Sequence, residues 1–213
     1  MSFDFLIFDL DGTLVDSQYD ITLCINLVRK EYGFNALSVE QVRSYLGDGI
    51  NVLMNKVMSE KAGVNMNKIV EKFKFYYKQN LTKTTVMYEG VREMLEALRD
   101  KKKAILSNKN ENFCKKIVEV LGISSYFVQI RGGDSIDVKK PNPKTVLDLV
   151  KLTNSDISKT IMIGDSVNDF LVAKSAGVLS MAVSYGYSNV KCFKKYSPNY
   201  IVKTAKDIVD IVL

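Results

Sequence analysis

The chain has 213 residues, of which 46% are hydrophobic and 25% charged, a composition typical of a folded protein with its own core. It contains no histidine, which excludes histidine-ligated zinc, Ser-His-Asp triads and histidine general bases. The net charge is +6, but the lysines are scattered among acids. This pattern favours a solvated surface over a nucleic-acid footprint, and a mild positive charge suits a small anionic substrate.

The three cysteines, at positions 24, 114 and 192, are too widely spaced to indicate a disulfide framework or a metal cluster. The N-terminus lacks the basic region and the apolar run of a signal peptide, and no stretch is long enough to span a membrane. We therefore expect a cytoplasmic protein, a monomer or a homodimer, with no membrane and no nucleic-acid partner.

The first predicted element is a strand at residues 5–9. Residues 16–82 follow without a convincing strand and show helical patterns at 17–32, 38–46, 50–62 and 67–81. We expect a separate helical domain over residues 16–85, inserted into a core made of residues 1–15 and 86–213. The alternative is that these helices simply cover the sheet, although so many consecutive helices would overfill one face.

Beyond the insertion, apolar runs alternate with amphipathic segments. Helices are predicted at 90–101, 110–121, 143–152, 167–176 and 204–212, and strands at 103–107, 126–130, 160–164, 180–184 and 200–202. Near-continuous apolar strands that alternate with helices are typical of a parallel sheet covered on both faces. The expected fold class is therefore α/β, with a doubly wound parallel sheet.

Two aspartates, Asp9 and Asp11, stand at the end of the first predicted strand with one leucine between them. In an extended chain, residues i and i+2 point to the same side, so the two carboxylates would project together and repel each other. A cation compensates such a pair most simply, and Mg²⁺ prefers oxygen ligands. The alternative is a turn at Asp11-Gly12, which explains the second aspartate but not the first.

Polar residues also stand at the ends of two later strands, with Ser107 and Asn108 at one and Asp165 at the other. In open parallel sheets, ligands bind beyond the carboxyl ends of the strands, where the strand order reverses. Carboxylates, helix N-termini and a cation gathered there would favour phosphoryl transfer. The alternative for Ser107 or Asn108 is that one of them only caps the following helix.

Two further residues have a simple structural alternative. Asp169 follows Ser166 at the spacing of a capping box, so its role is either structural or part of the site. Lys140 lies in "KKPNP", and a loop lysine is usually only solvated. These local explanations do not account for the joint order and position of all the polar residues.

That order resembles the haloacid dehalogenase-like hydrolases, a superfamily of mostly Mg²⁺-dependent phosphatases. The resemblance covers the whole chain and rests on "DLDGT" at 9–13, "SN" at 107–108, "KPNP" at 140–143 and "GDSVND" at 164–169. It implies a Rossmann-like core with an all-helical cap that closes over the site and reads the leaving group. Asp11 favours phosphate chemistry, because the dehalogenases proper lack this second aspartate.

The resemblance also implies roles for individual residues. Asp9 would be the nucleophile that forms an aspartyl-phosphate, and Asp11 the general acid and then the base. Lys140 would neutralise Asp9 and the transferring group. Mg²⁺ would be held by Asp9, the backbone carbonyl of Asp11, and Asp165. Asp169 and Asn168 would support these ligands without binding the metal directly. Phosphate or substrate would be bound by Thr13, Ser107, Asn108, Arg43, Gly47 and Gly49.

Three of these residues, Arg43, Gly47 and Gly49, belong to "RSYLGDGI" at 43–50, which resembles the specificity loop of phosphoglycolate phosphatase-like members. The alternative is an ordinary turn between helices. The expected function is Mg²⁺-dependent hydrolysis of a small phosphorylated metabolite such as phosphoglycolate. Alternatives within the family are an inorganic pyrophosphatase, a nucleotide phosphatase or a β-phosphoglucomutase-like enzyme. Outside it, a receiver-type phospho-aspartate switch would be much shorter and lack the helical insertion, and a scaffold without catalysis would have lost some motif.

Overall fold

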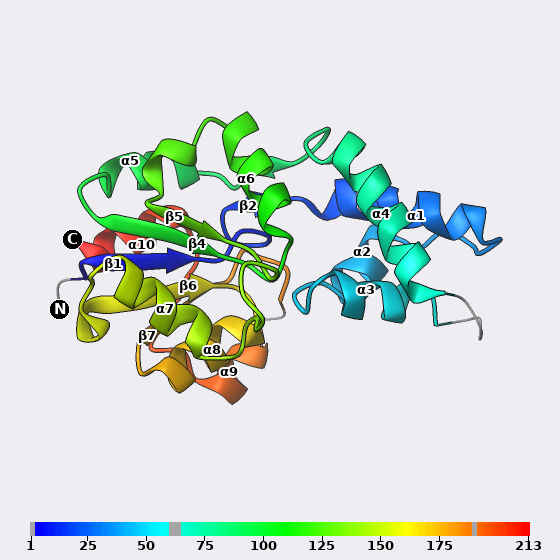
Figure 1. The fold of residues 1–213 in the computed structure, drawn as a ribbon. Helices are drawn as coiled ribbons and strands as arrows, with labels where there is room; N and C mark the ends of the chain where they lie inside the picture. The colour runs from blue at the N-terminus through cyan, green and yellow to red at the C-terminus, as the bar shows by residue number, and fades with distance from the viewer. Residues whose placement is uncertain (1–2, 60–64, 189–190) are drawn as a thin grey trace.

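The computed structural model describes residues 3–59, 65–188 and 191–213. In these ranges, one parallel sheet has the strand order β5-β4-β1-β6-β7-β8 (Figure 1). Its strands are β1 (Phe5–Phe8), β4 (Lys102–Leu106), β5 (Gln129–Arg131), β6 (Thr160–Gly164), β7 (Leu179–Val183) and β8 (Tyr200–Val202). The strand order reverses at β1, between β4 and β6, and a ligand crevice is expected beyond its carboxyl end. The predicted α/β class is confirmed.

Helices cover both faces of the sheet (Figure 1). One layer consists of α5 (Val91–Ala97), α6 (Glu111–Val120) and α10 (Ala205–Val212), and the other of α7 (Lys144–Leu152), α8 (Val167–Ala176) and α9 (Lys191–Tyr196). Because side chains of a strand alternate between faces, Leu6 and Phe8 of β1 pack in the cluster that contains Ile117 of α6. Phe5 and Ile7 pack in the cluster on the opposite face. β1 is therefore fully buried and holds Asp9 at a rigid position.

Among the described residues, four helices are inserted between the first strand and the rest of the core. They are α1 (Gln18–Glu31), α2 (Val39–Arg43), α3 (Ile50–Val57) and α4 (Met66–Asn80). The chain passes into and out of them through a short antiparallel pair, β2 (Val15–Asp16) and β3 (Val86–Met87). These helices pack on one another beyond the end of the sheet, rather than on its faces (Figure 1).

The strand predicted at 126–130 was placed too early. The chain first forms a 3-10 helix, η1 (Ser124–Tyr126), and the strand begins at Gln129. The aromatic residue after η1, Phe127, packs edge-on against Phe8, with 6.5 Å between the ring centroids. Its apolar character therefore reflects core packing and not a strand. A second 3-10 helix, η2 (Ile157–Lys159), and the elements β2, β3 and α9 were not predicted.

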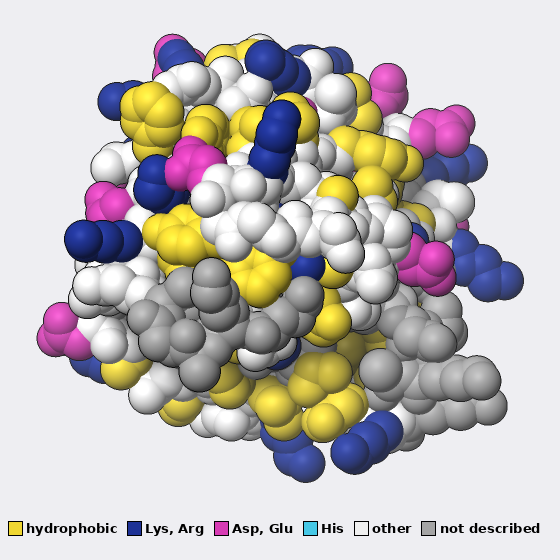
Figure 2. Space-filling view, turned by 90° about the vertical axis from the view of Figure 1, so that its right-hand side faces the viewer, with side chains coloured by type: hydrophobic (Ala, Val, Ile, Leu, Met, Phe, Trp, Pro, Cys, Tyr) yellow, Lys and Arg dark blue, Asp and Glu magenta, His cyan; other side chains and the backbone are white. Residues whose placement is uncertain are grey.

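The predicted helix at 50–62 ends at Val57 among the described residues, and positions 60–62 of that prediction lie outside them. The face at the helical end of the molecule shows Lys and Arg side chains interspersed with acidic and apolar ones (Figure 2). In the helical insertion, Lys56 pairs with Asp48 and Lys72 with Glu31. No helix in the described ranges has the length and apolar character needed to cross a membrane.

Candidate active site

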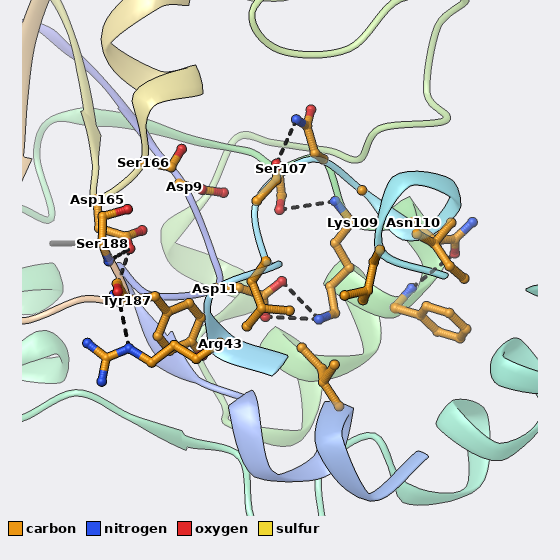
Figure 3. A pocket seen from close by; sticks show the side chains of 18 of the residues that line it. Asp9, Asp11, Arg43, Ser107, Lys109, Asn110, Asp165, Ser166, Tyr187 and Ser188 are labelled. Carbon is orange, nitrogen blue, oxygen red and sulfur yellow. Dashed lines mark hydrogen bonds and ion pairs between the residues drawn. The ribbon is translucent and has the colours of Figure 1, made fainter. Parts of the chain in front are cut away.

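A cavity of about 380 Å³ lies between the carboxyl ends of the central strands and the inserted helices. Its polar side is formed by core residues, and Figure 3 shows several of them around it. They are Asp9, Asp11, Ser107, Asn108, Asp165 and Ser166. The crevice expected from the strand order is therefore the place where the polar ends of β1, β4 and β6 meet.

Three buried carboxylates form the centre of this polar side. Asp9 directly follows β1, and its main-chain N–H donates to the carbonyl of Ile163 at 2.9 Å. One oxygen each of Asp9, Asp165 and Asp169 lies within 4.8 Å of the others. The Lys140 ammonium lies 3.0 Å from Asp9 Oδ1 and 2.6 Å from Asp169 Oδ1. One ammonium is thus paired with two of the three carboxylates, which leaves an excess of negative charge in the cluster.

The pKa values of Asp9 and Asp165 are raised by burial and, to a smaller extent, by the neighbouring negative charge. Burial raises the pKa of Asp9 to about 7, and the nearby charge of Asp169 adds to the effect. Burial likewise raises the pKa of Asp165 to about 8. For Lys140, burial opposes the charged form, but Asp169 and Asp9 outweigh it and raise the pKa. An all-oxygen donor set with surplus negative charge fits a hard divalent cation such as Mg²⁺.

Asp169 is engaged by the protein on both oxygens. Oδ1 accepts from Lys140, and Oδ2 accepts from the N–H and the hydroxyl of Ser166 at 2.9 and 2.7 Å. Asp169 thus closes the capping box of α8 and positions Lys140 at the same time. The structural and the functional interpretation of this residue are therefore compatible. Asp9 and Asp165 line the cavity, whereas Asp169 does not, so these two carboxylates are the ones open to a metal ion from the cavity.

Asn108 links three parts of the site. Its amide accepts from the N–H of Lys140 at 3.0 Å and donates to the carbonyls of Lys140 and Gly47, each at 3.0 Å. Ser107 lines the cavity, and its hydroxyl accepts from the N–H of Lys109 at 3.3 Å. Neither Ser107 nor Asn108 caps α6, because Asn110 is its N-cap. The capping alternative is therefore wrong for both.

Thr13 lies against the carboxylate cluster and outside the residues that line the cavity. Its hydroxyl donates to Asp165 Oδ1 at 3.3 Å. The neighbouring Gly12 has a φ of +84°, and a Cβ there would lie 2.7 Å from both carboxylate oxygens of Asp165. The turn after Asp11 therefore needs glycine, both for its backbone conformation and for the close approach of Asp165.

The segment 43–49 of the helical insertion contacts the core. Arg43 donates to the carbonyls of Gly186 and Tyr187 at 2.9 and 3.1 Å, as Figure 3 shows for Tyr187. The Asn168 amide donates to the Gly47 carbonyl at 3.2 Å. Arg43, expected to meet a substrate carboxylate, is thus engaged with backbone. Gly49 also approaches the core closely, since a Cβ there would lie 3.0 Å from the Asn108 carbonyl oxygen.

The sequence interpretation missed several residues of this site, among them Lys109 and Tyr187. Lys109 binds both oxygens of Asp11 at 2.9 Å, in the middle of the view in Figure 3. Its position directly after Ser107 and Asn108, at a strand end, was the available signal. The N–H of Tyr187 donates to Asp165 Oδ2 at 2.7 Å, and its hydroxyl accepts from the N–H of Ser17 at 2.8 Å. No motif or pattern in the local sequence indicates that Tyr187 belongs to the site.

Comparisons with known proteins agree with this geometry. A family model described as haloacid dehalogenase-like hydrolase matches residues 6–183. The chain is 34% identical to a phosphoglycolate phosphatase of Vibrio parahaemolyticus, over 96% of this chain and 94% of that protein. It is also 34% identical to a phosphoglycolate phosphatase of Aquifex aeolicus, over 97% of this chain and 95% of that protein. The crystal structure of a predicted phosphoglycolate phosphatase from Haemophilus somnus superposes with a TM-score of 0.93 at 30% identity, covering 100% of this chain and 99% of that one.

Proposed function

The chain belongs to the haloacid dehalogenase-like hydrolase family, and we propose that it is an Mg²⁺-dependent phosphatase of small phosphomonoesters. The observation that carries the proposal is the buried Asp9 carboxylate, which lies at the end of β1 against Lys140 and the Asp165–Asp169 cluster. Phosphoglycolate is the candidate substrate that the names of the relatives suggest. We further propose that residues 16–85 act as the cap that encloses the substrate.

In the proposed reaction, an Asp9 oxygen attacks phosphorus, and the bond between phosphorus and the ester oxygen breaks. Asp11 donates a proton to the departing alcohol. Asp11 then takes a proton from water as that water attacks the phosphorus of the aspartyl-phosphate, which releases inorganic phosphate and restores Asp9. Lys140 balances negative charge on Asp9 and on the transferring group throughout.

Mg²⁺ would be held by Asp9, Asp165 and the backbone carbonyl of Asp11, with Asp169 supporting the site through Lys140. When bound, it would lower the repulsion between the carboxylates and the anionic substrate. Ser107 lines the cavity beside Asp9 and is proposed to bind the phosphate oxygens. Asn108 is proposed to hold Lys140 and the Gly47 loop in place during the reaction.

The test is turnover of a panel of phosphorylated metabolites with Mg²⁺, using Asp9→Asn as the blank. We expect loss of at least about a thousandfold in that variant, because it lacks the attacking carboxylate. Denaturant quench with ³²P-labelled substrate should trap an acid-stable acyl-phosphate in the wild-type protein. Wild-type turnover by Asp9→Asn would contradict the mechanism. Pyrophosphate, nucleotides and hexose phosphates with a bisphosphate activator belong in the same panel, because they separate the family alternatives.

A further inference from the structure

The Gly47 loop, which connects α2 to α3 in the helical insertion, contacts three separate segments of the core. Asn108 donates to the Gly47 carbonyl at 3.0 Å. Asn168 donates to the same carbonyl at 3.2 Å and to Asp48 Oδ1 at 2.9 Å. The Lys139 ammonium donates to the Asp48 carbonyl. Donors that lie far apart in the sequence therefore hold one short loop through two of its carbonyls and one of its side chains.

Each of these core donors is adjacent in the chain to a residue of the proposed reaction. The pairs of neighbours are Ser107–Asn108, Lys139–Lys140 and Asn168–Asp169. Because two adjacent residues share a peptide unit, a side chain that is fixed by the loop also restricts the backbone from which its neighbour projects. The position of the Gly47 loop is therefore linked to the order of the reacting side chains.

The loop approaches the core so closely that Gly49 cannot carry a side chain. Its φ is +86°, and a Cβ there would lie 3.0 Å from the Asn108 carbonyl oxygen and 3.3 Å from the Lys139 ammonium nitrogen. Any larger residue would lift the loop away from both segments. The glycine therefore serves the contact between the insertion and the core.

Asp48 is the acidic residue of the Gly47 loop. Its carboxylate pairs with Lys56 of α3 at 2.9 Å, in addition to its hydrogen bond from Asn168. Burial disfavours the charge on Asp48, but these hydrogen bonds, with the nearby charges of Lys56 and Lys139, outweigh it and lower the pKa. Asp48 is therefore ionised at neutral pH, and its charge favours the Lys139 ammonium beside it.

We propose that Lys139 and Asn168 are positioning residues of the reaction, which hold the Gly47 loop against the core while Lys140 and Asp169 are ordered. The proposal rests on the proposed phosphatase function and on the proposed role of the insertion as a cap. Both residues lie outside the described residues that line the cavity, so they act through their neighbours and not on the substrate. Loss of either contact lowers the fraction of molecules with the loop closed, and kcat/KM falls with that fraction.

The first measurement is kcat/KM for the phosphomonoester that the wild-type protein hydrolyses best. Lys139→Met and Asn168→Ala should each lower it about three- to tenfold, the effect of one lost hydrogen bond. Lys144→Met is the matched control, because the Lys144 ammonium pairs with Asp148 at the surface of α7, and its kcat/KM should not change. Wild-type kcat/KM in both test variants would overturn the inference.

A double-mutant cycle tests whether the contact between Asn168 and Asp48 carries the effect. Asp48→Ala and Asn168→Ala remove the same interaction, so the double variant should lose clearly less than the product of the two single losses. A loss equal to that product would overturn the inference, because the two residues would then act independently.

Hydrogen exchange separates this inference from the phosphatase assignment, because it needs no substrate. In the full-length protein with Mg²⁺, the amides of residues 43–50 should exchange about threefold faster or more in Lys139→Met and Asn168→Ala than in the wild-type protein and Lys144→Met. The amides of β1 should stay protected in every variant, which shows that the fold is intact. If no ester were hydrolysed while this difference held, the proposed phosphatase function would fail and the role of the two residues in holding the loop would stand. Equal exchange in all four proteins would overturn the inference even if the wild-type protein hydrolysed phosphomonoesters.

Discussion

The Lys109 ammonium lies 2.9 Å from both carboxylate oxygens of Asp11, and the two side chains are 8% and 18% exposed. Burial disfavours the charge on Lys109, but Asp11 and Tyr77 outweigh this effect and raise its pKa. Ser17 donates a further hydrogen bond to Asp11 from the start of the helical insertion. The residue proposed as general acid and base is thus held by one group from the core and one from the insertion.

Replacing Lys109 by methionine should leave the partly buried Asp11 carboxylate without its cation. We expect the free energy of unfolding of Lys109→Met to fall by about 3 kcal/mol. In the double variant Lys109→Met/Asp11→Asn, most of this loss should be recovered, because the unpaired charge is gone, while phosphatase activity stays low. Urea unfolding at pH 7 measures both. A single variant as stable as the wild-type protein would show that the pair does not matter for stability.

Asp20 joins the two segments that connect the insertion to the core. It lies in the first turn of α1 and is buried, and its carboxylate accepts from the N–H and hydroxyl groups of Thr84 and Thr85 at 2.8 to 3.1 Å. Asp20→Asn replaces one acceptor by a donor that faces other donors. We expect its free energy of unfolding to fall by about 3 kcal/mol. The exposed Asp210→Asn is the control and should stay within about 0.5 kcal/mol of the wild-type value.

Arg43 donates to the backbone carbonyls of Gly186 and Tyr187 in the core. Two roles can therefore be distinguished for it: fastening the insertion to the core, or binding the substrate carboxylate. If Arg43 mainly fastens the insertion to the core, Arg43→Gln should lower kcat/KM by a similar factor, about three- to tenfold, for every substrate. We expect this uniform loss. A loss confined to phosphoglycolate, with other phosphomonoesters unaffected, would instead indicate that the guanidinium binds the substrate carboxylate. Steady-state kinetics on both classes of ester decides between these outcomes.

Much of the fold could be predicted because buried parallel strands leave long apolar runs. The run that ends at Phe8 and the run that ends at Gly164 each predicted a strand, and the polar residue after each one predicted a place in the crevice. The start of β5 could not be predicted in this way, because Phe127 is apolar for packing against Phe8. Local patterns describe burial, and they do not tell which buried residue extends a sheet.

Pairings between distant side chains were hidden for a different reason. The contact of Lys109 with Asp11 depends on how the chain turns after β4, and that of Tyr187 with Asp165 depends on a loop 22 residues further along. Neither the turn after β4 nor the loop that contains Tyr187 leaves a periodic pattern in the sequence. The strand ends directed attention to Asp9, Ser107 and Asp165, and the resemblance to the hydrolases implied roles for them and for Lys140, whereas residues outside its motifs needed coordinates.

Protonation of the carboxylate cluster should make stability depend on pH and on Mg²⁺ together. The pKa of Asp9 is raised to about 7 and that of Asp165 to about 8, above an ordinary value near 4. Without a metal, the folded state therefore binds more protons than the unfolded state between about pH 4 and 8. The stability that this supplies is complete below about pH 4 and is lost as the pH rises through 7 and 8.

We therefore expect the Tm of the metal-free protein to fall between pH 5 and pH 8.5. Mg²⁺ competes with protons for the carboxylates, so the same Mg²⁺ concentration should raise Tm more at pH 8.5 than at pH 5. Thermal unfolding with EDTA and with excess Mg²⁺ measures both effects. Because the asparagine side chain of Asp165→Asn does not ionise, this variant should show a weaker pH dependence of the metal-free Tm and a smaller rise of Tm with Mg²⁺. If wild-type protein and Asp165→Asn gave parallel curves, the raised pKa of Asp165 and its place in the metal site would both be wrong.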